Sequence, residues 1–360
     1  MSLLRPWKES ASLLIAAGLG RKAGAFDYRV LLLKRHSKAT FKNMYVAPGG
    51  VIDKADFSSD WPDLFSQHGF QSPFKSLLNI HGARPPILTT RHREGTTIPN
   101  EVAFRLCAIR ETFEESGILL VTDSESGNNG LRNGEGKLTN SSGVESVRAL
   151  SAGELDEWRK RVHNNAGEFI DLCSKLNCVP NIWALAEWAN YLTPPDFNHR
   201  FDTMFYMCCL DSVPNAVQDS QEMVHLKWST PAEALDEFRS GGASLPPPQI
   251  TELKRLGNFE RVSDLHEFAF NRESEGCVRS MPIKKKMTNG LVFIIPGDDL
   301  YPKEIDVAAK ADVENINQTY EETLQSVTNL NRLYFKGKSD FELLVNVKPP
   351  CGHLIPRLDL

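Results

Sequence analysis

The chain has little that would mark a membrane-spanning or nucleic-acid-binding protein. No uninterrupted apolar stretch reaches the roughly 18 residues that a membrane helix needs, so no membrane span is predicted. Its 41 lysines and arginines are outnumbered by 46 aspartates and glutamates, giving a net charge of −5, which argues against a basic nucleic-acid-binding surface. The one short basic run, Lys284-Lys285-Lys286, is expected to be a solvated turn rather than a phosphate or membrane patch.

Cysteine is also used sparingly. The chain has seven cysteines, an odd number, and no two of them have the Cys-x-x-Cys spacing of common zinc and redox sites. Cys107, Cys208 and Cys209 lie inside apolar runs, which is typical of small buried hydrophobic residues in a reducing compartment. A disulfide framework or a zinc site is therefore not expected.

What the sequence does contain is an alternation of short apolar runs and helical patterns. With 360 residues, 41% of them hydrophobic, the chain can bury a substantial core. Strands are predicted over residues 11–17, 28–34, 44–47, 186–191, 200–210, 224–228 and 291–295. Helices are predicted after residue 100, with Asn100 as the N-cap and Gly117 as the terminator, over residues 154–176, and after Pro231 and Pro246.

Two segments interrupt this pattern. Residues 54–99 are rich in proline, serine and glycine and are expected to be mostly loop, with a helix over Trp61–Gln67. Residues 123–146 are rich in glycine, asparagine and serine. Both are interpreted as insertions.

Three carboxylates in the helix after residue 100 are the chemical signal in this sequence. Glu111, Glu114 and Glu115 stand at positions i, i+3 and i+4, so they share one helix face and repel one another. A hard divalent cation offsets that repulsion, and oxygen ligands are what Mg²⁺ prefers. Arg110 can pair with Glu114 at i, i+4 and orient it. Taken alone, the cluster is more typical of an ordinary solvent-facing helix. Here, however, a strand and a Pro48-Gly49-Gly50 turn precede it and a strand follows it.

This arrangement resembles the Nudix box, G-x5-E-x7-R-E-U-x-E-E-x-G-U, in which U is a bulky apolar residue. Arg110-Glu111 and Glu114-Glu115-x-Gly117-Ile118 match its second half, and Gly49-Gly50 resembles its opening. The family has 19 positions between the first Gly and the last Glu, whereas 115 − 50 gives 65 here, so about 46 residues are inserted within the box. Thr112 replaces the usual apolar residue, and Val102 stands in place of the first Glu.

An insertion within the box is similar to one branch of the family, the animal coenzyme A diphosphatases of peroxisomes. Further stretches of similarity are residues 48–53, 108–117, 200–203, 245–249 and 295–301. Of a signature that precedes the box in coenzyme A hydrolases, this chain keeps Leu32-Leu33, Arg35 and Pro48-Gly49-Gly50.

The resemblance implies an α/β fold: a Nudix α/β/α sandwich with a mixed sheet, a long insertion within the box and a C-terminal extension. The Nudix domain is expected over residues 9–240, with insertions at about 54–99 and 123–146, and the extension over residues 241–360. The implied reaction is Mg²⁺- or Mn²⁺-dependent hydrolysis of the diphosphate of coenzyme A or acyl-CoA to 3′,5′-ADP and (acyl-)4′-phosphopantetheine.

Roles for individual residues follow from the same resemblance. Glu111 and Glu115 are expected as principal metal ligands, with Glu114 as a further ligand or base, and Arg110, Glu114 and Glu115 as the catalytic group. Gly49, Gly50, Arg35 and Arg200 are candidates for substrate binding. Glu222 is a candidate general base, with a solvated carboxylate at a strand edge as the alternative.

Two other functions stay open at this point. One is hydrolysis of a different nucleoside diphosphate derivative, such as a nucleotide sugar, a dinucleotide or capped RNA. The other is a non-catalytic Nudix-fold binding module, although such modules usually lose the box carboxylates that are present here. The resemblance suggests a peroxisome, but residues 357–360 do not match a Ser-Lys-Leu address, which leaves mitochondrion and cytosol open.

Overall fold

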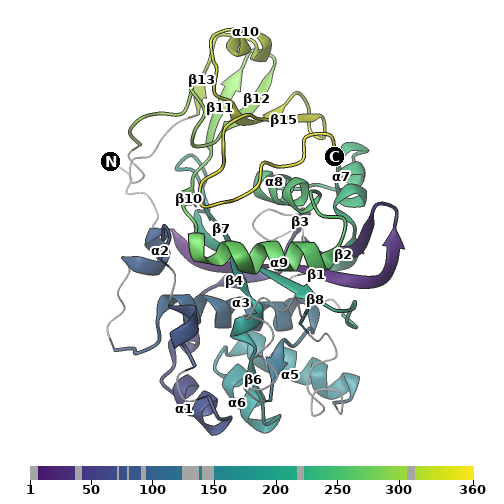
Figure 1. Cartoon of the computed structure of the whole chain (residues 1–360), viewed down its shortest axis with the longest axis vertical. Helices are drawn as coiled ribbons and strands as arrows, with labels where there is room; N and C mark the ends of the chain where they lie inside the picture. The colour runs from purple at the N-terminus through teal and green to yellow at the C-terminus, as the bar shows by residue number, and fades with distance from the viewer. Residues whose placement is uncertain are drawn as a thin grey trace.

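A mixed β-sheet between two layers of helices forms the centre of the molecule (Figure 1). The computed structural model describes residues 7–36, 43–70, 73–78, 81–90, 95–123, 138–139, 150–216, 223–305 and 313–360. The central sheet contains β1 (Lys8–Ala23), β2 (Phe26–Arg35), β3 (Tyr45–Val46), β4 (Gly49–Val51), β7 (Ala186–Leu192), β8 (Phe201–Leu210), β9 (Met223–Ser229) and β10 (Arg279–Ser280). Strands predicted in six of these places are confirmed.

The order of strands places the Pro-Gly-Gly turn beside the middle of the sheet. The main path runs β10-β7-β8-β1-β2-β3, with β4 paired to β1 and β9 to β2. β1 is parallel to β8 but antiparallel to β2 and β4, so the sheet is mixed as expected. Because Ser12 pairs with Gly49, the Pro-Gly-Gly turn is fixed against β1.

Side chains of β1 alternate between the two faces of this sheet, and each face is covered by helices. Leu13 and Ile15 belong to the core on one face, whereas Leu14 and Ala16 belong to the core on the other. The first face is covered by α3 (Asn100–Ser116), α1 (Asp60–Gln67), α5 (Ala152–Asn164) and α6 (Glu168–Lys175), and the second by α9 (Val262–Arg272). The α/β/α sandwich is therefore confirmed.

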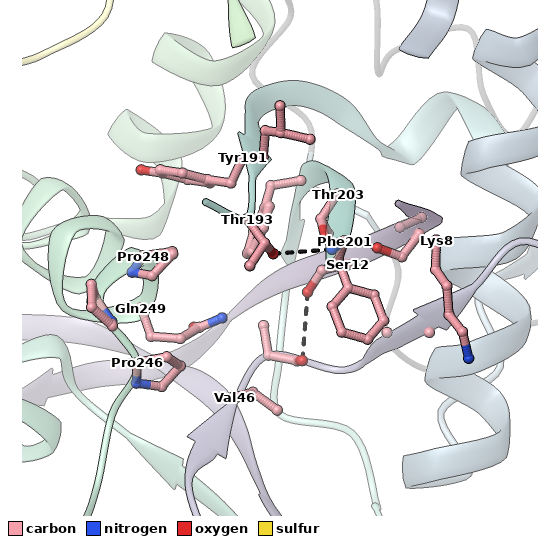
Figure 2. A pocket seen from close by; sticks show the side chains of 18 of the residues that line it. Lys8, Ser12, Val46, Tyr191, Thr193, Phe201, Thr203, Pro246, Pro248 and Gln249 are labelled. Carbon is pink, nitrogen blue, oxygen red and sulfur yellow. Dashed lines mark hydrogen bonds between the residues drawn. The ribbon is translucent and has the colours of Figure 1, made fainter. Parts of the chain in front are cut away.

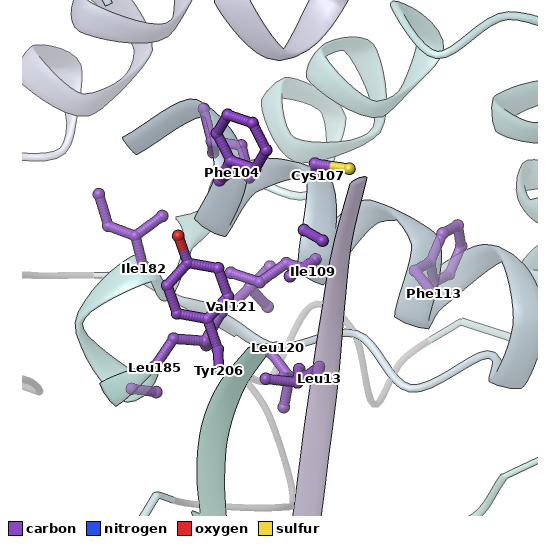
Figure 3. Packing of buried hydrophobic residues seen from close by; sticks show 14 of the residues in the cluster. Leu13, Phe104, Cys107, Ile109, Phe113, Leu120, Val121, Ile182, Leu185 and Tyr206 are labelled. Carbon is purple, nitrogen blue, oxygen red and sulfur yellow. The ribbon is translucent and has the colours of Figure 1, made fainter. Parts of the chain in front are cut away.

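The core beneath α3 holds this helix in place along nearly its whole length. Phe104, Cys107, Ile109 and Phe113 are all fully buried and belong to the same core cluster as Leu13 (Figure 3). Burying a side chain of this size stabilises the fold by about 1.5–3 kcal/mol. The helix that carries the box carboxylates is therefore a rigid support.

Buried ion pairs add a second set of constraints on α3. Arg105 of α3 is fully buried and pairs with Glu273 at 2.8 Å and with Glu187 of β7 at 3.5 Å. Arg84, from the inserted segment, also pairs with Glu187 and reaches Glu101 at 3.2 Å. Breaking such a buried pair costs about 3–5 kcal/mol, so the insertion, α3 and β7 are tied together.

The C-terminal part forms a second, five-stranded sheet that packs on the first domain. Its order is β13-β11-β12-β14-β15, with β11 at Ile283–Met287, β12 at Gly290–Ile294, β13 at Glu314–Asn315, β14 at Asn331–Phe335 and β15 at Phe341–Val345. Phe293 and Leu333 of this sheet share a core with Leu235 of α7 (Pro231–Arg239) and Leu253 of α8 (Pro247–Leu256). The placement of the domain boundary near residue 240 stays a prediction.

Several local predictions are wrong. The single helix over residues 154–176 is two helices, because the chain bends between Asn164 and Glu168. Ser151 and Glu154 form a capping box at the start of the first one. Asn100 is the first residue of α3 and Pro99 is the N-cap. Within residues 54–99 the expected helix over Trp61–Gln67 is confirmed as α1, whereas η1 (Lys54–Phe57), η2 (Lys75–Leu77) and α2 (Pro86–Thr89) were not predicted.

The basic run at 284–286 is also not the solvated turn that was expected. It lies on β11, where Lys284 pairs with Asp196 at 2.5 Å and the largely buried Lys285 pairs with Glu314 at 2.8 Å. The expectation that Cys107, Cys208 and Cys209 are buried is confirmed. Over the part of the chain that the structure describes, none of the helices has the length and apolarity to cross a membrane.

Candidate active site

The carboxylates stand on the last turns of α3, and local contacts fix where this helix ends. Gly117 follows at a left-handed φ of 73°, a conformation that glycine adopts without strain. Thr112 occupies an apolar position of the box because its hydroxyl donates to the Ala108 carbonyl at 2.7 Å, which satisfies the buried polar group. The Arg159 guanidinium donates to the Glu114 carbonyl at 2.9 and 3.1 Å, capping the final turn.

The distant glycine pair meets these carboxylates directly. The backbone N–H of Gly49 donates to Oε2 of Glu115 at 2.9 Å. A Cβ at Gly50 would lie 2.3 Å from the carboxyl carbon of Glu111, and a Cβ at Gly49 would lie 2.3 Å from the Ala11 carbonyl oxygen. The backbone contact requires glycine at position 49, and a side chain at position 50 would displace the Glu111 carboxylate. The two halves of the split box therefore form one site.

Arg110 lies at the centre of the acidic cluster. Its guanidinium contacts both Asp56 carboxylate oxygens at 2.9 Å, Glu111 at 2.8 Å and Glu114 at 2.7 Å. Burial opposes its charge, but Asp56 and Glu111 raise the Arg110 pKa well above its ordinary value. The predicted i, i+4 pair between Arg110 and Glu114 is present, and Asp56 from the inserted segment provides a buried, bidentate partner.

Burial and mutual repulsion raise the pKa values of the carboxylates. Burial and nearby Glu114 together raise the pKa of Glu111 to about 7, against the lowering effect of Arg110. Burial likewise raises the pKa of Glu114, while Arg110 and His163 oppose that change. Nδ1 of His163 lies 3.5 Å from Oε2 of Glu114. Negative charge is thus concentrated here beyond what Arg110 alone neutralises.

Glu111 stands where two cavities meet. The acidic cavity, about 350 Å³, is lined by residues that include Asp53, Arg110, Glu111, Glu114, Glu115 and His163. The apolar cavity, about 470 Å³, extends from Gly49, Gly50 and Glu111 across β1 and β8 to Phe197, Pro246 and Phe293 (Figure 2). Among the described residues, only Glu111 and Val51 line both cavities. A ligand could therefore place a charged centre at Glu111 and a larger, less polar body in the apolar cavity.

The donor set of the acidic cavity fits a hard divalent cation. Four carboxylates line it, Asp53 and the three of the box, and Oε2 of Glu111 accepts no hydrogen bond from the described residues. Within the described part of the chain, however, no three acidic, histidine or cysteine side chains already converge as ligands around one point. Glu111 and Glu114 each give one oxygen to Arg110, so cation binding would use their other oxygens together with Glu115.

The remaining predicted residues have different positions. Arg35 lines the apolar cavity, and its Nε is buried without a hydrogen-bond partner among the described residues. Arg200 lines neither cavity as the described residues form them: its guanidinium stacks on the Trp7 ring at 4.0 Å, and burial lowers its pKa. Glu222 lies outside the described residues. The structure thus unites Arg35, Gly49, Gly50 and the box residues but not Arg200.

Three site residues were missed by the sequence prediction. Asp56 follows Asp53 at the three-residue spacing of a capping box, a signal that indicated a helix start but was overlooked within the insertion. Arg159 and His163 are four residues apart on α5, but nothing local in the sequence indicates that this helix packs beside α3. Their positions follow only from tertiary structure.

Comparison with known proteins agrees with this geometry. The family model for the NUDT19 Nudix domain matches residues 7–256, and the model for the NUDT19 C-terminal domain matches residues 286–346. The first match defines the chain as a Nudix hydrolase, a class that generally uses a divalent metal ion.

Full-length relatives narrow that class. The acyl-coenzyme A diphosphatase NUDT19 of Xenopus laevis is 39% identical over 98% of this chain and 96% of its own length. The proteins of the same name from Gallus gallus and Homo sapiens are 37% and 36% identical, over 98% and 99% of this chain and 95% and 97% of their own lengths. The chain belongs to the NUDT19 family, as the split box predicted.

Proposed function

We propose that this protein hydrolyses the diphosphate bond of coenzyme A or acyl-CoA, giving 3′,5′-ADP and 4′-phosphopantetheine or its acyl ester. The observation that carries the proposal is the position of Glu111 at the junction of an acidic and a larger apolar cavity. The substrate has the matching form, because its diphosphate lies between a nucleotide and a long, uncharged arm. The names of the near-full-length relatives support the same substrate class.

Glu111, Glu115 and Glu114 would hold the metal, with Mg²⁺ as the proposed ion and Mn²⁺ as the alternative. When bound, such an ion neutralises diphosphate charge and makes a water molecule more acidic. The Gly49 N–H holds the Glu115 carboxylate towards the cavity, and Arg110 orients Glu111 and Glu114. Water adds to one phosphorus, the bond from that phosphorus to the bridging oxygen breaks, and the bridging oxygen leaves on the other phosphate.

The site also bears on which group accepts the proton of the attacking water. Nδ1 of His163 and Oε2 of Glu114 lie 3.5 Å apart in the acidic cavity, and either group can accept a proton. Both residues are therefore candidates for the general base. Glu222 stays a candidate from sequence alone. Replacing each in turn and measuring the pH dependence of kcat separates these candidates.

The function is tested by product analysis. The purified protein is incubated with CoA, acetyl-CoA and octanoyl-CoA, with Mg²⁺, with Mn²⁺ or with a chelator, and products are separated by chromatography. We expect 3′,5′-ADP in equimolar amount with the phosphopantetheine product, only when metal is present. Turnover of nucleotide sugars, dinucleotides or capped RNA in preference to CoA esters would overturn the substrate, and binding without turnover of any diphosphate would indicate a binding module.

The compartment is a separate proposal. The likeness to the peroxisomal branch supports a peroxisome as the place of action. Imaging the full chain with a tag at the N-terminus, beside peroxisomal and mitochondrial markers, tests it. Mitochondrial or diffuse signal would contradict the proposal.

A further inference from the structure

The far wall of the apolar cavity differs from its catalytic end in charge. We call this wall the roof: Pro246, Pro247, Pro248, Gln249, Pro282 and Phe293. The charged residues that line the cavity are Lys8, Arg35 and Glu111, which come from β1, β2 and α3, and the roof has none. Pro246, Pro248 and Gln249 lie across the cavity from Phe201 and Lys8 (Figure 2).

Gln249 is the polar exception in the roof. Its side chain is 4% exposed, it lines the cavity, and its Oε1 is buried without a hydrogen-bond partner among the described residues. Leaving a buried acceptor unsatisfied costs about 1–3 kcal/mol, so such a group is expected to meet a ligand. Pro246, Pro247 and Pro248 come directly before it, and the α8 start that they form fixes its backbone.

The charges of the two halves of the substrate decide which half meets this roof. The nucleotide half of CoA carries an additional 3′-phosphate, whose burial against an uncharged apolar wall is strongly unfavourable. The pantetheine arm is uncharged, has two amide N–H donors, and in acyl-CoA ends in a hydrocarbon chain. An apolar wall with one unsatisfied carbonyl acceptor fits this arm.

We propose that Gln249 is a specificity-determining residue whose Oε1 accepts a hydrogen bond from a pantetheine amide N–H, with the acyl end of the arm beneath Phe293. This inference rests on the proposed function and adds the direction in which the substrate lies. The diphosphate stays at Glu111, the uncharged arm points towards the C-terminal sheet, and the nucleotide half points away from the roof. The C-terminal domain thereby becomes part of the substrate site.

The hydrogen bond is tested with a double-mutant cycle between protein and substrate. One partner is Gln249→Leu, and the other is a CoA analogue in which one amide N–H is replaced by an ester oxygen, made separately for each of the two amides. With wild-type protein, we expect one analogue to raise KM about three- to tenfold, the usual worth of one hydrogen bond. With Gln249→Leu, the KM for CoA should rise by a similar factor over the wild-type value. In this variant, the KM for that analogue should not exceed the KM for CoA.

The outcomes separate this inference from the proposed function. Independent, additive effects of Gln249→Leu and both ester analogues, with CoA still hydrolysed by the wild type, would overturn the role of Gln249. Failure of the wild type to hydrolyse any CoA ester would instead overturn the proposed function. Gln249→Glu adds a readout that a merely structural role would not produce. The carboxylate of this variant still accepts a hydrogen bond, so its KM should remain lower for the amide substrate than for the ester analogue.

The position of the acyl end is tested with a matched pair of variants. Phe293 lines the cavity, whereas Phe335, on the neighbouring strand β14, has its ring 5.9 Å from that of Phe293 and does not line it. We expect Phe293→Ala to raise the KM for octanoyl-CoA several-fold relative to that for CoA, and Phe335→Ala to leave this ratio unchanged. An equal effect of Phe293→Ala on both substrates would contradict the proposed direction of the arm.

Discussion

The backbone N–H of Gly49 donates a 2.9 Å hydrogen bond to Oε2 of Glu115, although 66 residues separate them. This contact joins the turn after β3 to the end of α3, which are the two halves of the box. A carboxylate held by a backbone donor stays oriented when no cation is bound. The contact also explains why a long insertion within the box leaves the site intact. The Gly49 turn is anchored by the sheet and α3 by the core, so neither depends on the length of the chain between them.

Removing the charge of Glu115 should stop turnover without unfolding the protein. Glu115→Gln keeps an oxygen that can accept from Gly49, so the free energy of unfolding should change little. Loss of a metal ligand should lower kcat by orders of magnitude. Steady-state kinetics and a urea titration measure the two effects, and near-normal kcat in this variant would rule out Glu115 as a ligand.

Gly50→Ala should reduce activity while preserving the fold. The new Cβ would lie 2.3 Å from the carboxyl carbon of Glu111, which is the far end of a flexible side chain and can move. A displacement of about 1 Å at a reacting centre can cost on the order of 10²-fold, so we expect kcat to fall about 10- to 100-fold. Gly153→Ala is the control, because a Cβ there on α5 meets nothing within 4 Å. Equal kcat values for the two variants would contradict the close approach.

Asp56→Asn should destabilise the whole domain. Asp56 is 1% exposed and Arg110 4% exposed, so losing the carboxylate leaves a buried guanidinium with less compensating charge. We expect the free energy of unfolding to fall by about 3 kcal/mol, measured by chemical denaturation. Asp156→Asn, which removes an exposed pair with Lys160, should have little effect and serves as the control. Equal stability of the two variants would show that Asp56 is dispensable.

Stability should decline as the pH falls from about 6.5 towards 4, in part because of His266. This side chain on α9 is 2% exposed, and burial lowers its pKa to about 4. The unfolded chain therefore takes up a proton at His266 in this window and the folded protein does not, which favours unfolding as the pH falls. His266→Gln should remove a pH-dependent contribution on the order of 2–3 kcal/mol. Parallel stability-versus-pH curves for wild type and variant would contradict this.

The fold class and the core of the site were predictable because their signals are local. The Arg110–Glu115 spacing on a helix, the Gly49-Gly50 turn and the apolar runs each follow from residues near one another in sequence. Asp56, Arg159 and His163 were missed because they reach the site through packing of α5 and the inserted segment against α3. Arg200 was a candidate by likeness of its motif, whereas its guanidinium stacks on Trp7, a contact that sequence spacing does not encode.

Arg110 also gives the acidic cluster a counter-charge of its own. In the absence of a bound cation, its guanidinium links Asp56, Glu111 and Glu114 and limits their mutual repulsion. Metal loading would then add a second positive partner at the other oxygens of Glu111 and Glu114, in a cluster that Arg110 already holds in place. The enzyme can therefore remain folded through cycles of metal loss and reloading, and its response to metal supply becomes a graded change in activity rather than in the amount of folded protein.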